Sequence, residues 1–140
     1  MNEPQALSAE DVARVRASFD RVWPRSAEMT ELFYRRLFDV TPDVRTLFHD
    51  DMTEQRRKFI GTLATIVGNL DTAVAMSMAA TLAHHHVAYG VRPDHYPLVG
   101  EALLFSLAQT LGDQLSSEEA ASWSRAYAMI SDHMVRTAYS

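Results

Sequence analysis

The residues with the greatest capacity for chemistry lie in one short stretch, LAHHHVAYGVRPDHYPLVG at 82–100. The stretch contains three consecutive histidines, His84, His85 and His86, then His95 and Tyr96. Imidazole is a common metal ligand, and its pKa lies close to neutral pH. The first question is therefore whether one of these histidines binds a metal-containing group.

A zinc site made from the three adjacent histidines conflicts with helix geometry. Neighbouring residues on a helix point about 100° apart, so at most one of the three faces a given interior point. Helical zinc ligands are instead spaced by three or four residues, with carboxylates or thiolates nearby. A single inward histidine is the better interpretation.

The spacing of apolar residues favours His86 as that histidine. One stripe has spacings of four, three, four and three residues and consists of Ala75, Ala79, Leu82, His86 and Tyr89. A competing stripe consists of Val74, Met78 and His85. The small residues before His86 leave room for a broad, flat group against the helix. Periodicity alone leaves a second interpretation open, in which His86 lies at the edge of the core and bonds a carbonyl.

The elements that must position this stretch are predicted to be helices throughout. Apolar residues recur every three or four positions, and no alternating strand pattern is present. Ser8 with Asp11 and Ser116 with Glu119 resemble capping boxes at two helix starts. We expect Asp71 to cap the helix that carries His86. The prediction is an all-α fold of six to seven helices in a single domain, residues 1–140.

Composition narrows the possible functions. The chain has 140 residues and no cysteine, which excludes disulfides, thiolate metal sites and covalent C-x-x-C-H haem attachment. A net charge of −5 argues against nucleic acid as the main partner, because QRRK at 55–58 is the densest basic cluster. There is no stretch long and apolar enough to span a membrane, and no secretion signal. We expect a soluble cytoplasmic domain.

Five segments in a fixed order resemble one known family. They are LFYRRLF at 32–38, TPDVRTLF at 41–48, QRRKF at 55–59, HVAYGVRPDHYPLVG at 86–100 and W-x-x-A-Y at 123–127. In order and spacing they resemble the bacterial single-domain globins of the flavohaemoglobin-like family, from about Ser8 to Tyr139. The resemblance implies a globin fold around one pocket that holds haem b. It also implies diatomic gases as ligands: dioxygen, nitric oxide and carbon monoxide.

The resemblance assigns roles to individual residues. His86 resembles the proximal histidine that binds haem iron, and Phe48 the phenylalanine that packs on the haem face. Tyr34 and Gln55 resemble the distal tyrosine and glutamine that donate hydrogen bonds to a bound ligand. The further residues that the resemblance places at the pocket are Phe59, Leu63, Tyr96 and Val99. Phe59 stands where relatives often have leucine, so we expect it to narrow access for ligands or to shift the distal pair.

The proximal side departs from the family pattern. In relatives the tyrosine at the position of Tyr96 pairs with a glutamate on the last helix, and the pair increases the imidazolate character of the histidine. Here that glutamate position holds Ala138, and the nearest acid is Asp132. The chain also ends at Ser140 without the flavin and nicotinamide domains of the flavohaemoglobins. His49, beside Phe48, is a minor candidate for a sixth iron ligand.

These residues predict a haem-binding globin that binds dioxygen reversibly and tightly. The alternatives are a nitric oxide dioxygenase that uses an external reductase, and a haem-based gas sensor. A haem-free helical interaction module is the remaining class. No catalytic residue is assigned at this point.

Overall fold

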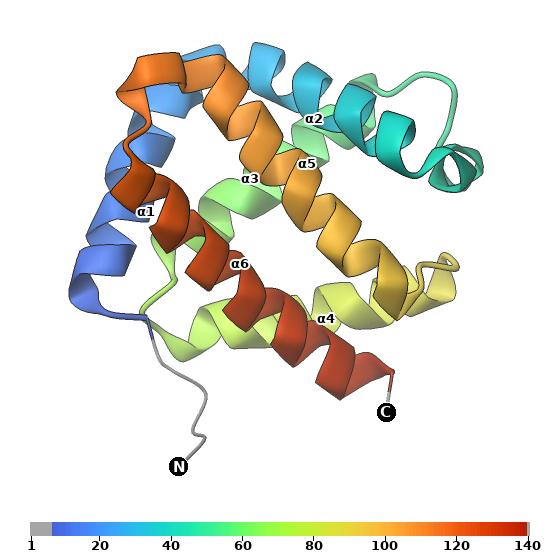
Figure 1. Ribbon diagram of the computed structural model, residues 1–140. Coiled ribbons are helices and arrows are strands. Elements are labelled where there is room, and N and C mark those ends of the chain that lie inside the picture. The colour runs from blue at the N-terminus through green and yellow to red at the C-terminus, as the bar shows by residue number, and fades with distance from the viewer. Residues whose placement is uncertain (1–6, 140) are drawn as a thin grey trace.

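The structure, a computed structural model, describes residues 7–139 as a helical chain (Figure 1). Its α-helices are α1 (Ala9–Val22), α2 (Ser26–Val40), α3 (Thr53–Gly68), α4 (Ala73–Ala88), α5 (Tyr96–Leu111) and α6 (Ser117–Ala138). Short 3-10 turns lie between them: η1 (Trp23–Arg25), η2 (Pro42–Leu47), η3 (Pro93–His95) and η4 (Gly112–Gln114). The described residues contain no strand, as predicted. The two ends of the predicted domain 1–140, including part of the N-terminal segment searched for a secretion signal, lie outside them.

The helices pack in pairs that cross the molecule. Helix α5 packs along α2, while α6 packs against both α1 and α4 (Figure 1). Helices α3 and α4 follow one another as a hairpin joined by residues 69–72. This arrangement puts the segment that carries His86 between α3 on one side and α6 on the other.

The helix starts follow the chemistry of their caps, with one correction. Ser8 and Ser116 form the predicted capping boxes with Asp11 and Glu119. The predicted cap of α4 is wrong: the hydroxyl of Thr72, not Asp71, accepts a hydrogen bond from the Val74 amide. Asp71 instead accepts a hydrogen bond from Arg16 of α1 at 2.9 Å. Because the carboxylate of Asp71 is bound in this longer-range ion pair, the next residue, Thr72, caps the helix.

Two clusters of buried side chains form the core. The larger cluster joins α1, α2, α5 and α6 and includes Phe33, Tyr34, Leu103, Leu107 and Trp123. The smaller cluster lies between α4 and α6 and consists of Ala75, Ala79, Ala83, Tyr96, Ile130 and Met134. The predicted site residues lie in or beside these two clusters, so the packing of the core fixes the site.

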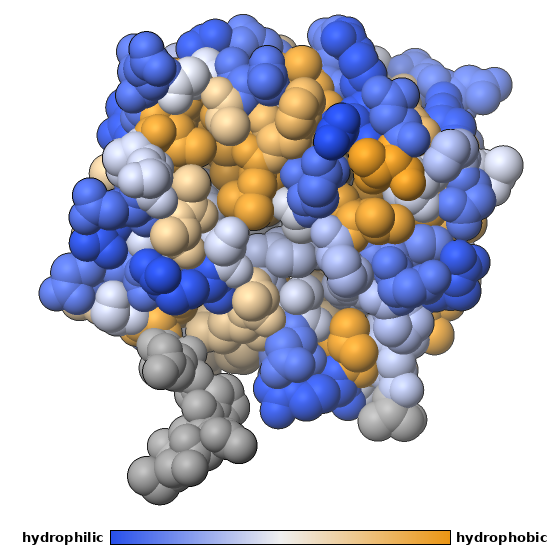
Figure 2. Space-filling view, viewed as in Figure 1, coloured by the Kyte–Doolittle hydropathy of each residue, from blue (hydrophilic) through white to orange (hydrophobic). Residues whose placement is uncertain are grey.

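On the face shown in Figure 2, polar residues surround several separate patches of apolar residues. Between Leu7 and Tyr139 there is no helix long and apolar enough to cross a membrane.

Candidate haem site

The three consecutive histidines differ in their environments. His84 and His85 are exposed, whereas His86 is partly buried. Its side chain reaches toward Tyr96 at the start of α5. Helix geometry therefore separates the three as expected, and His86 is the inward one.

The stripe predicted for α4 is only partly correct. Ala75 and Ala79 are fully buried against α6, together with Ala83. Tyr89 is 71% exposed, because α4 ends at Ala88 and the stripe ends with it. Alanines on this face let α6 approach α4 closely, and this contact sets the position of the helix end that carries His86.

On the proximal side, His86 faces a tyrosine instead of a backbone carbonyl. Its Nδ1 lies 3.2 Å from the Tyr96 hydroxyl oxygen. Burial, and to a smaller extent the neighbouring His85, lowers the pKa of His86 and favours the neutral ring. Within residues 7–139, no side chain or carbonyl hydrogen-bonds to Nε2 of His86. A neutral imidazole with one nitrogen engaged and the other free is suited to binding a metal.

Besides His86 and Tyr96, a second pair of site residues, Tyr34 and Gln55, lies on α2 and α3. Gln55 donates a hydrogen bond from Nε2 to the hydroxyl oxygen of Tyr34 at 3.0 Å. Burial raises the pKa of Tyr34 to about 12, so its hydroxyl is protonated at neutral pH. Its oxygen already accepts from Gln55, and no acceptor for its own proton is found in the described part of the chain. A buried hydroxyl donor without a protein acceptor indicates a place for a polar ligand.

Aromatic rings hold Tyr34 in place. Phe59 stacks on Phe33 with ring centroids 4.3 Å apart, and both Phe48 and Phe59 meet the Tyr34 ring edge-on. The half-buried Leu63 and Val99 pack against the same cluster. The structure thus places Phe48 and Phe59 against the Tyr34 ring, and Leu63 and Val99 in the same hydrophobic cluster.

Gln55 of one pair and His86 of the other lie on the two helices that the turn at 69–72 joins, α3 and α4. Counting outward from the turn at 69–72, Gln55 and His86 are equally distant from its centre, as are Phe59 and Leu82. A cleft of about 300 Å³ opens between the two helices, lined by Thr62, Ser77, Met78, Thr81, Leu82 and His85. It contains no carboxylate.

The packing of α3 fits a flat apolar group in this gap. Val67 is the one fully buried residue of α3, although the helix carries five further apolar side chains that are only half-buried: Phe59, Ile60, Leu63, Ala64 and Ile66. Protein atoms alone do not cover this face. Together with the free Nε2 of His86, these residues fit a haem group.

The predicted absence of an acid beside Tyr96 agrees with the geometry. Asp132 is exposed and pairs with Arg136, and Ala138 offers no polar group. A residue that the sequence comparison missed lies there instead: the hydroxyl of Tyr139 is 3.4 Å from the hydroxyl of Tyr96. Tyr139 lies one position after Ala138, where a position-by-position comparison gives no signal.

The remaining candidate ligand, His49, lies at the surface. The side chain of His49 is exposed, and its carbonyl accepts a hydrogen bond from Arg45. Across residues 7–139, no three His, Asp or Glu side chains are grouped in a way that would hold a metal ion.

Comparisons with known proteins agree with this geometry. The family model described as Globin matches residues 31–134. The Flavohemoprotein of Rhizobium meliloti is 33% identical over 104 residues, which cover 71% of this chain and 26% of the relative. The Flavohemoprotein of Bordetella pertussis is 30% identical over 133 residues, which cover 92% of this chain and 33% of the relative. The chain thus spans about a third or less of the length of these curated relatives.

Solved structures share the fold. A bacterial globin from Campylobacter jejuni superposes with a TM-score of 0.81 at 22% identity, covering 93% of this chain and 95% of that one. A flavohemoglobin from Malassezia yamatoensis, determined with bound FAD and heme, gives 0.78 at 18% identity and covers 95% of this chain and 37% of that one. The predicted all-α globin fold and the resemblance to flavohaemoglobin-type globins are confirmed, and with them the assignment to the haem-binding globins. This chain belongs to the globin family.

Proposed function

We propose that this protein binds haem b through Nε2 of His86 and binds dioxygen reversibly on the opposite face. The proposal rests on one observation. The buried Tyr34 hydroxyl has its oxygen occupied by Gln55 and its proton free, and the Nε2 of His86 is also free. When bound, the haem iron would supply an open coordination position for a diatomic gas.

The residues of the chain would act on that ligand from both sides. Gln55 fixes the Tyr34 oxygen as an acceptor, so the Tyr34 proton is available to a ligand that carries negative charge. Phe48, Phe59 and Leu63 exclude water, which strengthens that hydrogen bond. Tight binding and slow release of oxygen follow, as expected of a storage or scavenging protein more than of a carrier.

A second candidate function is nitric oxide dioxygenase activity, favoured by the similarity to proteins named Flavohemoprotein. In this reaction nitric oxide and dioxygen give nitrate, and an external reductase with a nicotinamide cofactor would return the electron. The cytoplasm, as predicted from the sequence, would supply such a partner. No specific feature of the structure favours a gas sensor.

One experiment separates the two functions. The reduced, oxygen-saturated protein is mixed with nitric oxide, with and without a flavin reductase and a nicotinamide cofactor. Steady consumption over many equivalents assigns the dioxygenase. A single stoichiometric burst under both conditions assigns oxygen binding alone. A protein purified without haem and unable to take it up contradicts both.

A further inference from the structure

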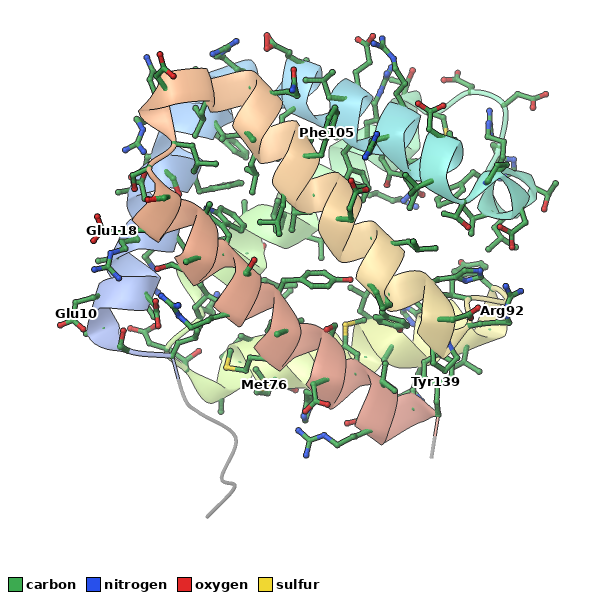
Figure 3. All side chains as sticks on the ribbon, viewed as in Figure 1. Glu10, Met76, Arg92, Phe105, Glu118 and Tyr139 are labelled. Atoms are coloured by element: carbon green, nitrogen blue, oxygen red, sulfur yellow. The ribbon has the colours of Figure 1, made fainter. Side chains whose placement is uncertain are left out.

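The hydrogen bonds behind His86 form a continuous chain of four groups. The His86 Nδ1 lies 3.2 Å from the Tyr96 hydroxyl, which lies 3.4 Å from the Tyr139 hydroxyl. Tyr139 in turn donates to the carbonyl oxygen of Val91 at 2.8 Å. Tyr139 closes α6 beside the loop that follows α4, on the side where Arg92 projects (Figure 3).

The Val91 carbonyl, at the end of this series of hydrogen bonds, sets the direction in which the protons point. A carbonyl oxygen only accepts, so the single proton of Tyr139 is committed to Val91. In the 3.4 Å contact between the two hydroxyls Tyr139 can then serve only as the acceptor, so Tyr96 is the donor there. Tyr96 can therefore meet His86 only as an acceptor, and the proton must lie on Nδ1 of His86.

The chain of hydrogen bonds returns to the segment that carries His86. The backbone amide of Val91 donates to the carbonyl of His86 at 2.9 Å, while the carbonyl of Val91 accepts from Tyr139. The end of α4, the loop after it and the end of α6 are thereby joined in one ring of hydrogen bonds. The ring contains no charged group.

We propose that Tyr139 is a positioning residue that holds His86 in the Nδ1-protonated tautomer, through Tyr96, and leaves Nε2 as the free ligand atom. The inference rests on the proposed function for the identity of the bound group, but the tautomer is a property of the protein without haem. The Tyr139 hydroxyl, hydrogen-bonded to the Val91 carbonyl, orients the Tyr96 proton without carrying a charge. An acidic side chain at this place would orient it by electrostatic attraction.

The first test uses the haem-free protein and ¹⁵N NMR of the His86 ring, which distinguishes the two neutral tautomers. The variant Tyr139→Phe removes the acceptor of Tyr96, whose proton is then free to turn to Nδ1. The tautomer ratio is expected to shift toward the Nε2-protonated form by about two- to tenfold, the effect of one hydrogen bond. An unchanged ratio would overturn the proposal.

The matched control is Tyr127→Phe on the same helix. The Tyr127 hydroxyl bonds the backbone carbonyl of Tyr96 and not its hydroxyl, so its removal leaves the proton chain intact. The His86 tautomer should remain as in the unmodified protein. An equal shift in both variants would mean that loosening α6 alone moves the histidine, which also contradicts the proposal.

A second readout uses the haem-loaded, reduced protein. The Fe–His stretching frequency in resonance Raman spectra reports how strongly Nδ1 donates, and it should fall in Tyr139→Phe and stay constant in Tyr127→Phe. A constant frequency in both contradicts the role of Tyr139. Failure of every variant, and of the unmodified protein, to take up haem would contradict the proposed function, and the NMR result would then decide this inference alone.

Discussion

Tyr34 is the residue on which the distal chemistry depends. Replacing it with phenylalanine keeps the ring that packs between Phe48 and Phe59 but removes the hydroxyl. One hydrogen bond in an apolar pocket contributes about 1–2 kcal/mol, so oxygen dissociation should become roughly 5- to 30-fold faster. Stopped-flow displacement of oxygen by carbon monoxide measures this rate. An unchanged rate would show that the hydroxyl does not reach the ligand.

Gln55 acts through Tyr34 in this structure, since its amide donates to the Tyr34 oxygen. Replacing Gln55 with leucine should speed oxygen dissociation in the unmodified protein and have little further effect when Tyr34 is already phenylalanine. The coupling energy from the double-mutant cycle is expected to be about 0.5–3 kcal/mol, the range for residues in contact. Additive effects would indicate that Gln55 contacts the ligand independently.

At the scale of helices, the crossing of α5 and α6 depends on Gly100. A Cβ added there would lie 2.6 Å from a ring carbon of Tyr127, whose hydroxyl is tied to the Tyr96 carbonyl. Gly100→Ala should therefore lower the free energy of unfolding by about 1–3 kcal/mol, as overpacking does. Chemical denaturation measures this change.

Gly61 provides the matched control for this prediction. It lies in α3 with no atom within 4 Å of an added Cβ. Gly61→Ala should stabilise the protein by roughly 0.5–1 kcal/mol, because alanine loses less backbone entropy in a helix. Equal effects of the two substitutions would mean that α5 and α6 do not approach each other at Gly100.

The helices themselves could be predicted from the sequence, because their signals are local. The capping boxes at Ser8 and Ser116 and the stop at Gly112 depend on residues within one turn. Asp71 was mispredicted as a cap because its partner, Arg16, lies 55 residues away along the chain. Capping rules that consider only neighbouring residues cannot predict a partner as distant along the chain as Arg16.

Only those site residues whose positions match the motifs of the family could be predicted from the sequence. His86, Tyr34 and Gln55 could be named from their motifs, and the structure pairs Gln55 with Tyr34 and His86 with Tyr96; their roles stay predictions. Tyr139 could not be named, because the expected acid position is Ala138 and the phenol reaches Tyr96 only through the geometry at the end of α6. A tyrosine at a non-matching position gives no signal in a linear comparison.

At the scale of the whole molecule, Asp11 ties the first helix to the last. Its carboxylate accepts hydrogen bonds from Arg125 and Ser122 of α6 at 2.7 and 2.8 Å. These bonds, that from Arg125 above all, hold the pKa of Asp11 well below its ordinary value of 3.8. A depressed pKa in the folded state contributes stability above the ordinary value, and this stability is lost as the pH falls below it.

Asp11→Asn should therefore lower the free energy of unfolding at neutral pH by roughly 1–3 kcal/mol, the range for disturbing a buried hydrogen-bonded group. The difference from the unmodified protein should shrink as the pH falls below 3.8. Urea denaturation over a range of pH values measures it. The control is Asp20→Asn, at an exposed position of α1. A difference independent of pH would contradict the role of the Asp11 charge.

We propose His86 as the single haem ligand of this protein. The most direct measurement is titration of the haem-free protein with haem, followed in the Soret region, for the unmodified chain and for His86→Ala and His85→Ala. We expect the unmodified protein and His85→Ala to give the same spectrum, which shifts with carbon monoxide after reduction. His86→Ala should lose the histidine-ligated spectrum. An unchanged spectrum in His86→Ala, with its loss in His85→Ala, would contradict the assignment.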